Sequence, residues 1–219
     1  MRKSRIGVLL AVAAALASAS APGLAFDLAK VTARVRAIRI DPADKSDPIA
    51  ALAVPQDAID VSNKWAPDID FEYAFTDRFA VELLLTIPQK HSVIARETAL
   101  GPNVRLGTVT HLPPTLTGKY YFATGSVRPY LGAGINLTWF TQDRLAVAGV
   151  GSLDIDNLSV GPALQAGVDF DLGNRWSISI DVKKAWISTD VSLGGTKLTT
   201  VDVDPYILGI GAGYRFGAN

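Results

Sequence analysis

The chain has 219 residues, with 21 lysines and arginines against 21 aspartates and glutamates, two histidines and no cysteine, and its mean hydropathy is +0.23. This length suits one domain, and the balanced charge excludes the basic surface typical of proteins that bind nucleic acid. Without cysteine there is no disulfide, thiolate nucleophile or cysteine-ligated metal, and two histidines are too few for a three-histidine site, so we expect no metal and no cofactor.

The start of the chain has the pattern of an export signal. Basic residues among the first five positions precede an apolar run over residues 6–17, and small residues then lead to Ala25. The apolar run is shorter than the roughly 20 residues that a membrane-spanning helix needs. We therefore predict a cleaved signal peptide over residues 1–25 and a single exported domain over residues 26–219.

After the signal, apolar and polar residues alternate with the two-residue period of β-strands. The segments with this alternation are residues 28–40, 65–75, 79–87, 115–123, 128–140, 158–172, 176–186 and 203–216. We expect these eight segments to be strands, with no sizeable helix.

The predicted connections alternate between short and long. Short turns at residues 76–78, 124–126 and 173–174 alternate with long segments over residues 41–60, 88–114, 141–157 and 188–202. This alternation around an even number of strands is typical of outer-membrane barrels, whose periplasmic turns are short and whose extracellular loops are long. We predict an all-β fold, an eight-stranded antiparallel transmembrane β-barrel with short periplasmic turns and long extracellular loops.

The four tryptophans agree with a membrane position. Trp65, Trp139 and Trp186 fall at predicted extracellular strand ends and Trp176 at a periplasmic end, all on the apolar side. Aromatic residues gather at both interfaces of membrane barrels, whereas the core of a soluble β-sandwich, the alternative, would place some in mid-strand. We expect these tryptophans to anchor the barrel against outer-membrane lipid and lipopolysaccharide.

The inward side of the predicted strands is charged toward the periplasmic end. The charged residues there include Arg34, Arg36, Glu72, Glu82, Lys119, Asp169 and Arg215. Buried charges persist when they are paired, so we predict that these side chains form a salt-bridged plug in the lumen.

Toward the extracellular end the inward side is mostly apolar, and Asp68 and Asp70 are exceptions. An eight-stranded barrel has room for its own side chains or for one small ligand. We predict that a small hydrophobic molecule binds at Ile38, Leu84, Phe140 and Ile207, with Leu52 and Val54 at the entrance.

The predicted loops over residues 48–55 and 145–153 are unusually apolar. Exposed apolar patches usually mark binding sites, although loops packed on each other as a lid are an equal alternative. Pro67 and Pro162, on the lipid-facing side, lack amide donors and weaken their ladders. Either marks a candidate gap for sideways release, and strand bulges explain both prolines equally well.

Runs in nearly all predicted strands resemble the outer membrane protein W (OmpW) family. These runs are VRAIRIDP (35–42), IPQKH (87–91), HLPPTLTGKYYF (111–122), RPYLGAGINLTWF (128–140), residues 159–172, DVKKAWISTD (181–190) and DPYILGIGAGYRF (204–216). The resemblance implies a barrel of the bacterial outer membrane, in a family associated with passage of small hydrophobic molecules. It also implies recognition by the barrel assembly machinery through Tyr214 and Phe216, although three residues follow Phe216.

We therefore predict uptake of small hydrophobic molecules, and a structural or adhesive barrel with a filled interior is the alternative. A lipid-modifying barrel enzyme is a third class, because His91, Ser92, Glu97 and His111 lie near one another on a predicted hairpin. Adjacent His91 and Ser92 point to opposite sides of an extended chain, and no serine-elbow motif is present. We predict no catalytic residue and no enzymatic activity.

Overall fold

In the computed structural model, the described residues are 27–49, 54–98, 101–147, 149 and 151–217. The signal peptide predicted over residues 1–25 and the predicted entrance residue Leu52 lie outside them. A single turn of 3-10 helix (η1, Leu28–Lys30) precedes the first strand. In the described part of the chain, no helix is long and apolar enough to cross a membrane.

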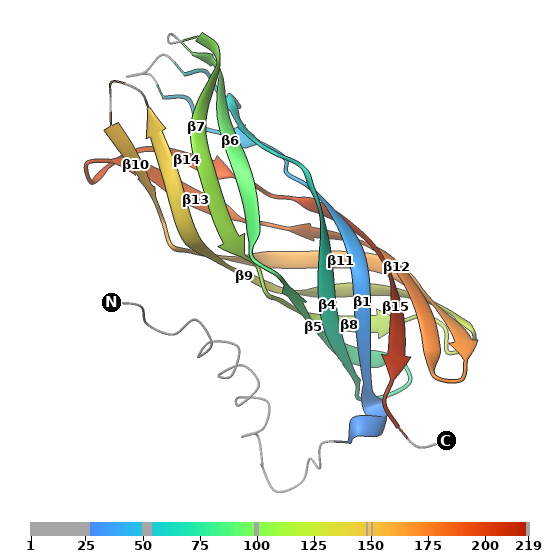
Figure 1. Cartoon of the computed structure of the whole chain (residues 1–219). Helices are drawn as coiled ribbons and strands as arrows, with labels where there is room; N and C mark the ends of the chain where they lie inside the picture. Colours follow the sequence, from blue (N-terminus) through green and yellow to red (C-terminus); the bar gives the residue numbers. More distant parts are fainter. Residues whose placement is uncertain (1–26, 50–53, 99–100, 148, 150, 218–219) are drawn as a thin grey trace, which may run out of the picture.

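Eight strands pair antiparallel around a closed barrel (Figure 1). In ring order they are β1 (Val31–Asp41), β4 (Lys64–Ala74), β5 (Phe79–Thr86), β8 (Thr115–Tyr121), β9 (Val127–Val147), β11 (Leu158–Gly173), β12 (Trp176–Ala185) and β15 (Tyr206–Arg215). β15 pairs with both β12 and β1, so the ring has no open edge. The predicted eight-stranded barrel is confirmed.

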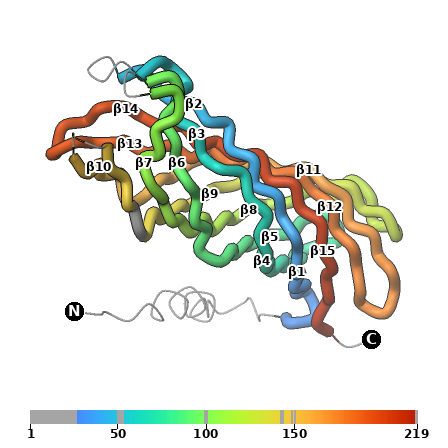
Figure 2. The backbone as a smooth tube through the Cα atoms, turned by 45° about the horizontal axis from the view of Figure 1, so that its top comes forward, coloured from blue at the N-terminus to red at the C-terminus, as the bar shows by residue number. Residues whose placement is uncertain are grey.

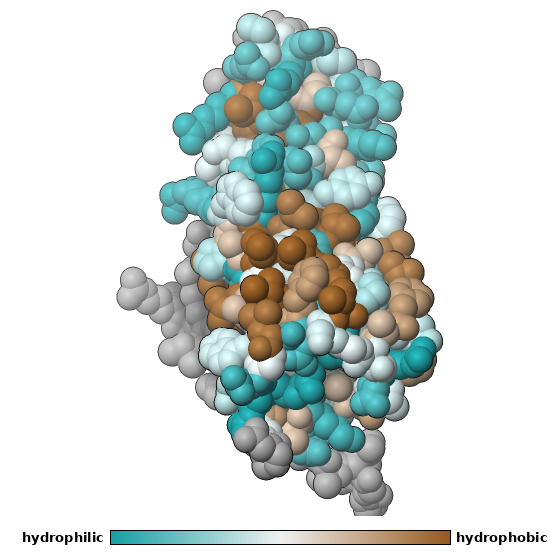
Figure 3. All heavy atoms as spheres, turned by 90° about the vertical axis from the view of Figure 1, so that its right-hand side faces the viewer, coloured by the Kyte–Doolittle hydropathy of each residue, from teal (hydrophilic) through white to brown (hydrophobic). Residues whose placement is uncertain are grey.

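The outward side chains of the barrel strands are large and apolar. Val35, Trp65 and Leu131 are each more than half exposed. Figure 3 shows such side chains gathered in an apolar belt on one face, with hydrophilic residues above and below it. All four tryptophans lie on the outside. Their role as interface anchors remains a prediction.

The sheet continues beyond the barrel, where the sequence predicted loops. The additional strands are β2 (Lys45–Ser46), β3 (Ile59–Val61), β6 (Gln89–Thr98), β7 (Gly101–Leu112), β10 (Gly151–Ile155), β13 (Ser188–Leu193) and β14 (Thr196–Asp202). Together with the upper part of β9 they form what we call the extension, at the end of the molecule opposite η1 (Figures 1 and 2).

The predicted long connections between barrel strands are therefore present, but most of them carry paired strands instead of irregular loop. Along β6, side chains alternate between buried and less buried positions, with His91, Val93 and Ala95 inside. The same alternation that marks barrel strands thus continues through them. Pairing with distant strands turns these apolar segments into a second, inward-facing apolar layer.

Candidate functional site

The barrel lumen holds a cluster of ten buried charged side chains, which we call the charge cluster. Its members are Arg34 and Arg36 of β1, Asp68, Asp70 and Glu72 of β4, Glu82 of β5, Lys119 of β8, Asp169 of β11, and Asp181 and Lys183 of β12. Each is no more than 3% exposed.

Two arginines join the walls of the barrel through this cluster. Arg34 donates to Asp70 at 3.0 Å, and to Glu72 and Asp169 at 2.9 Å each. Arg36 grips Asp68 through two hydrogen bonds of 2.9 Å and reaches Asp181 at 2.7 Å. A planar guanidinium suits such multidentate pairing, so each arginine crosslinks β1 to β4 and to the strands opposite.

Glycines in β15 make room for these arginines. A side chain at Gly211 would lie 2.4 Å from Cγ of Arg36, and one at Gly213 would lie 2.9 Å from Cγ of Arg34. Both glycines are therefore required for close approach of β1 side chains.

Lysine and tyrosine side chains complete the cluster. Lys119 donates to Glu72 at 2.6 Å and to Glu82 at 3.1 Å, and Lys183 lies 3.2 Å from Glu82. The Tyr121 hydroxyl lies within hydrogen-bond distance of two carboxylates, Glu72 at 2.8 Å and Asp169 at 2.7 Å. The buried carboxylates thus have charged or hydroxyl partners, as a low-dielectric lumen requires.

The structure brings together six of the seven predicted plug residues. Arg215 is the exception, because it is exposed at the last position of β15 and makes no ion pair within the described residues. The sequence analysis predicts Asp68 and Asp70 as exceptions in an apolar cup. Instead, both belong to the charge cluster and form ion pairs with the two arginines. Asp181 and Lys183 were not predicted to belong to the plug, although their alternation already placed both on the inner side.

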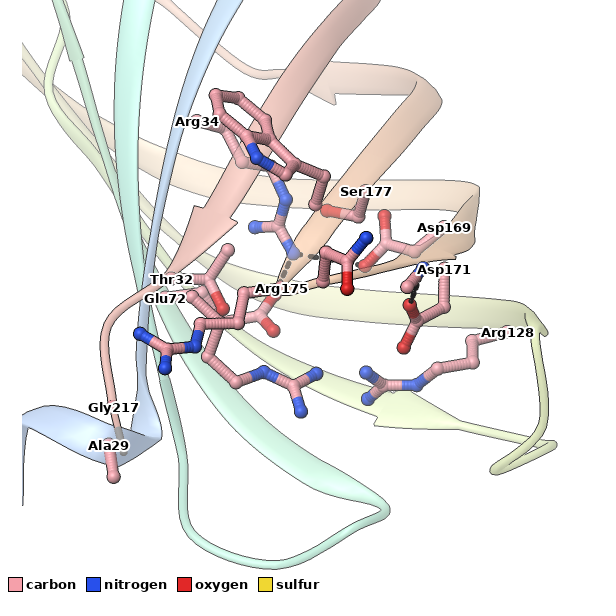
Figure 4. Close-up of a pocket in the computed structure, with 14 residues that line it drawn as sticks. Ala29, Thr32, Arg34, Glu72, Arg128, Asp169, Asp171, Arg175, Ser177 and Gly217 are labelled. Carbon is pink, nitrogen blue, oxygen red and sulfur yellow. Dashed lines mark hydrogen bonds and ion pairs between the residues drawn. The ribbon is translucent and has the colours of Figure 1, made fainter. Parts of the chain in front are cut away.

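Below the charge cluster, the lumen opens to a polar cavity of about 280 Å³ (Figure 4). Arg128, Arg175 and Arg215 line it together with Asp171, beside the turn between β11 and β12. The Arg128 guanidinium lies 4.0 Å from the centre of the Tyr121 ring. This end of the molecule is therefore polar and open to water, while the cluster above it is closed.

Above the barrel, the extension encloses an apolar cavity of about 90 Å³, which we call the apolar pocket. Most residues that line it are apolar, among them Ile49, Val54, Ile59, Val93, Val109, Phe140, Leu145, Val147, Leu153, Val191 and Val201. Four polar residues, His91, His111, Thr189 and Thr199, complete the lining.

The predicted ligand site is thereby divided. Phe140, predicted to bind the ligand, and Val54, predicted at the entrance, both line the apolar pocket, and these two roles stay predictions. Ile38 and Ile207 pack elsewhere, in a small layer with Ile40 and Ala66, and Leu84 is buried without lining the pocket. The pocket lies higher than predicted because the strands continue beyond the barrel, and side chains fill the space below.

Backbone pairing is interrupted beside the pocket. Pairing between β4 and β5 ends at Asp68 and Thr86, and pairing between β3 and β6 resumes at Val61 and Val93. Between these points, residues 63–67 and 87–91 are not paired with each other, although residues 64–67 pair with β1 and residues 89–91 pair with β7 on their other sides. We call these two facing segments the seam. Pro67 and Pro88, which lack amide donors, both lie in it.

The second predicted gap is not present. Pro162 faces Ile135 in an unbroken ladder, and its carbonyl accepts a hydrogen bond from the Trp186 amide at 3.1 Å. The described residues also contain no group of three or more histidine, aspartate or glutamate side chains arranged to hold a metal ion.

Comparisons with known proteins agree on one family. The family model described as OmpW family matches residues 28–216. Outer membrane protein W of Vibrio cholerae is 32% identical over 216 residues, covering 94% of this chain and 97% of that protein. The dibenzothiophene metabolism operon protein PahQ of Pseudomonas aeruginosa is 36% identical over 167 residues, covering 74% and 77%. The crystal structure of OprG from Pseudomonas aeruginosa matches with a TM-score of 0.73 and 30% identity, covering 86% of this chain and 96% of that one.

Proposed function

The chain belongs to the OmpW family of bacterial outer-membrane barrels, and from this premise we propose that it takes up small hydrophobic molecules. In this proposal a molecule enters the apolar pocket from outside the cell and leaves sideways through the seam into the bilayer. The observation that carries the proposal is the apolar pocket itself, a cavity lined almost entirely by apolar side chains on the extracellular side.

The charge cluster supports a sideways exit. An apolar molecule moving straight down the lumen would have to displace the ion pairs of Arg34 and Arg36, whose separation leaves charges buried and unpaired. Entry into the surrounding hydrocarbon carries no such cost, because bilayer tails are as apolar as the molecule.

The seam also supports a sideways exit. His91 lines the apolar pocket and belongs to the seam, so the pocket and the gap between the two seam segments adjoin. Within the described residues no backbone–backbone hydrogen bond joins the two segments, and Lys64 Nζ donates to the Lys90 carbonyl at 3.4 Å. Separating the two sides therefore breaks fewer backbone hydrogen bonds than opening a paired ladder would.

One relative agrees with an apolar substrate. PahQ is named for an operon of dibenzothiophene metabolism, and dibenzothiophene is an apolar aromatic compound. For our chain we propose the chemical class alone, small molecules with alkyl or aromatic groups.

Uptake by cells tests the proposal. Phe140→Asp places a charge in the pocket, and Thr141→Asp places the same charge at the next, exposed position of β9 as a matched control. We expect Phe140→Asp to slow uptake of p-xylene by about tenfold or more, because an unpaired charge in an apolar cavity is costly. Thr141→Asp and the uptake of small hydrophilic solutes should stay at the wild-type level.

The outcome separates the two principal alternatives. If Phe140→Asp assembles into the outer membrane and imports p-xylene at the wild-type rate, the uptake proposal is wrong and a structural or adhesive barrel replaces it. We propose no catalytic activity, since the Nδ1 atom of His91 contacts the Ser62 carbonyl oxygen, at 2.7 Å, rather than a serine hydroxyl.

A further inference from the structure

We propose that the polar cavity at the end of the barrel opposite the extension is a second binding site, which takes a phosphate group between Arg128, Arg175 and Arg215. The short turns assign this end to the periplasm. The cavity has a volume of about 280 Å³ and shares no lining residue with the apolar pocket, so the proposal is independent of hydrophobic uptake. It starts from the charges of the lining, because a cleft that gathers charges of one sign attracts ligands of the other.

The three arginines reach the cavity from separate parts of the chain. Arg128 lies near the start of β9, Arg175 in the turn between β11 and β12, and Arg215 at the end of β15. The Arg215 amide donates to the Arg175 carbonyl at 3.0 Å, so these two residues are neighbours in space. Figure 4 shows the Arg128 side chain pointing into the cavity. The fold therefore brings three cationic groups to one opening.

The buried acidic residues of the lining do not neutralise Arg128. Asp169 lies opposite Arg128 in the register of β9 and β11. Its carboxylate is bound within the charge cluster, where it accepts from Arg34 at 2.9 Å and from Ser179 at 2.7 Å. Glu72 likewise accepts from Arg34 at 2.9 Å. Within the described residues Arg128 makes no ion pair, although two carboxylates line the same cavity.

One acidic residue of the lining lies outside the charge cluster. This residue is Asp171, and its Oδ1 atom accepts from the Gly173 amide at 2.8 Å. Three arginines thus face one carboxylate at the mouth of the cavity. Guanidinium groups pair with phosphate oxygens through two parallel hydrogen bonds, and a phosphate has enough oxygens to contact arginines from different strands at once.

Arg128 is held in position before any ligand binds. Its side chain is partly buried, and its Cζ atom lies 4.0 Å from the centre of the Tyr121 ring. A guanidinium over an aromatic ring is attracted by the ring face, which restricts its motion. Binding to a restricted side chain costs less conformational entropy than binding to a free one. We therefore expect Arg128 to contribute most to the site.

The charge cluster behind the cavity limits the affinity. Its six carboxylates and four basic side chains leave two negative charges in excess, which oppose an incoming anion. Direct contacts, rather than the long-range field, must therefore hold the phosphate, and we expect weak binding. A phosphate group reaches this opening from two sources, a soluble phosphate compound of the periplasm or the headgroup of a phospholipid.

Amide NMR tests the site and separates these sources. The ¹⁵N-labelled protein in phosphatidylcholine nanodiscs is titrated with inorganic phosphate, with sodium chloride at equal ionic strength as the control. We expect saturable shifts from phosphate at Asn174 and Ser177, which line the cavity, and none at Val93 in the extension. In a second arm, phosphatidylglycerol nanodiscs replace the added phosphate. The same shifts in this arm would identify a lipid headgroup as the ligand, and shifts in the first arm alone a soluble phosphate.

A matched pair of variants tests the contribution of Arg128. Arg128→Gln removes one positive charge and should weaken phosphate binding about tenfold. Arg78→Gln removes the same charge from another periplasmic turn, where Arg78 is exposed and does not line the cavity, and should change binding by less than about twofold. Equal weakening by the two variants would reduce the effect to overall charge and overturn the proposal.

Arg175→Gly separates ligand binding from a structural role of the turn. Asn174 and Arg175 have φ angles of +50° and +72°, a conformation that favours glycine at the second position of a two-residue hairpin turn. The variant should therefore keep or raise the urea midpoint of unfolding while weakening phosphate binding severalfold. A lower midpoint with unchanged binding would contradict the role of Arg175. If neither inorganic phosphate nor phosphatidylglycerol shifts the amides of the cavity, the phosphate site is wrong.

Discussion

The barrel lumen and the extension are built on the inward face of one continuous sheet, and β9 runs through both, yet their interiors have opposite chemistry. The lumen holds ten buried charges that pair across the barrel, within a ring whose ladders are closed. The extension holds an apolar cavity beside two strand segments that are not paired with each other. The difference indicates that side-chain content, rather than fold, separates the charged lumen from the apolar pocket that we propose binds ligands.

Removing one partner from the charge cluster should have the largest effect. Asp169→Ala deletes a buried carboxylate that accepts from Arg34, Tyr121 and Ser179, leaving the buried Arg34 guanidinium with one fewer partner. We expect a loss of about 3 to 5 kcal/mol in the free energy of unfolding, measured with urea in lipid vesicles.

Arg215→Ala is the matched control at the same end of the barrel. Because Arg215 is exposed and outside the cluster, its removal should change the free energy of unfolding by less than about 0.5 kcal/mol. Equal losses for the two variants would show that the charge cluster does not hold the lumen together.

Hydrogen exchange of backbone amides compares the seam with a barrel strand that is paired on both sides. Residues 89–91 of the seam pair with β7 on one side alone, whereas residues 69–73 of β4 pair with β5 on one side and β1 on the other. We expect the mean rate of hydrogen exchange of the amides at residues 87 and 89–91 to be at least about tenfold faster than at residues 69–73. Equal protection in both segments would contradict the proposed exit.

The smallest expected effect is a pH dependence confined to the extension. Burial, together with the neighbouring Asp60 and Asp41, raises the pKa of Asp44 to about 6, against the opposing effects of the hydrogen bond from the Val61 amide at 3.0 Å and of Arg96. A raised pKa means that the folded state binds the proton more tightly. The folded state therefore gains stability as pH falls from 7 to 5 and loses it as pH rises through 6.

Because Asp44 is only partly buried, this gain should stay below about 1 kcal/mol. The protection factor of the Val61 amide against hydrogen exchange measures this gain. In Asp44→Asn, which does not titrate, that protection factor should no longer change between pH 5 and pH 7. A protection factor of the Val61 amide that is lower at pH 5 than at pH 7 would reverse the predicted sign and contradict the raised pKa of Asp44.

The sequence predicts the barrel strands and their inner sides, but not which residues face one another across neighbouring strands. Alternation within a segment such as residues 65–75 identifies a strand and its inner side without knowledge of any neighbour. It does not reveal register, and register is what places Arg34 opposite Asp70 and Arg36 opposite Asp68. Without it, the two aspartates were taken as exceptions in an apolar cup.

The extension was missed for a related reason. The sequence predicts an apolar loop over residues 145–153 because strand partners of this segment lie far away in sequence: Leu153 pairs with Leu193, and Leu145 pairs with Gly107. Phe140 lies on the inner side of a continuous strand and lines the pocket, and its predicted role in ligand binding stays a prediction. The histidines of the lining shared the inner side with Val93 and Val109, a signal that sequence alternation contained.

The most direct test of the account is to locate a bound apolar molecule by methyl NMR. The protein, with labelled isoleucine, leucine and valine methyl groups, is titrated in nanodiscs with p-xylene. We expect shifts at pocket residues Val93, Val109, Leu145 and Val191 and none at Ile38 or Leu84 in the barrel below. Shifts at Ile38 and Leu84 with an unchanged pocket would place binding in the lumen and contradict the division between the two regions.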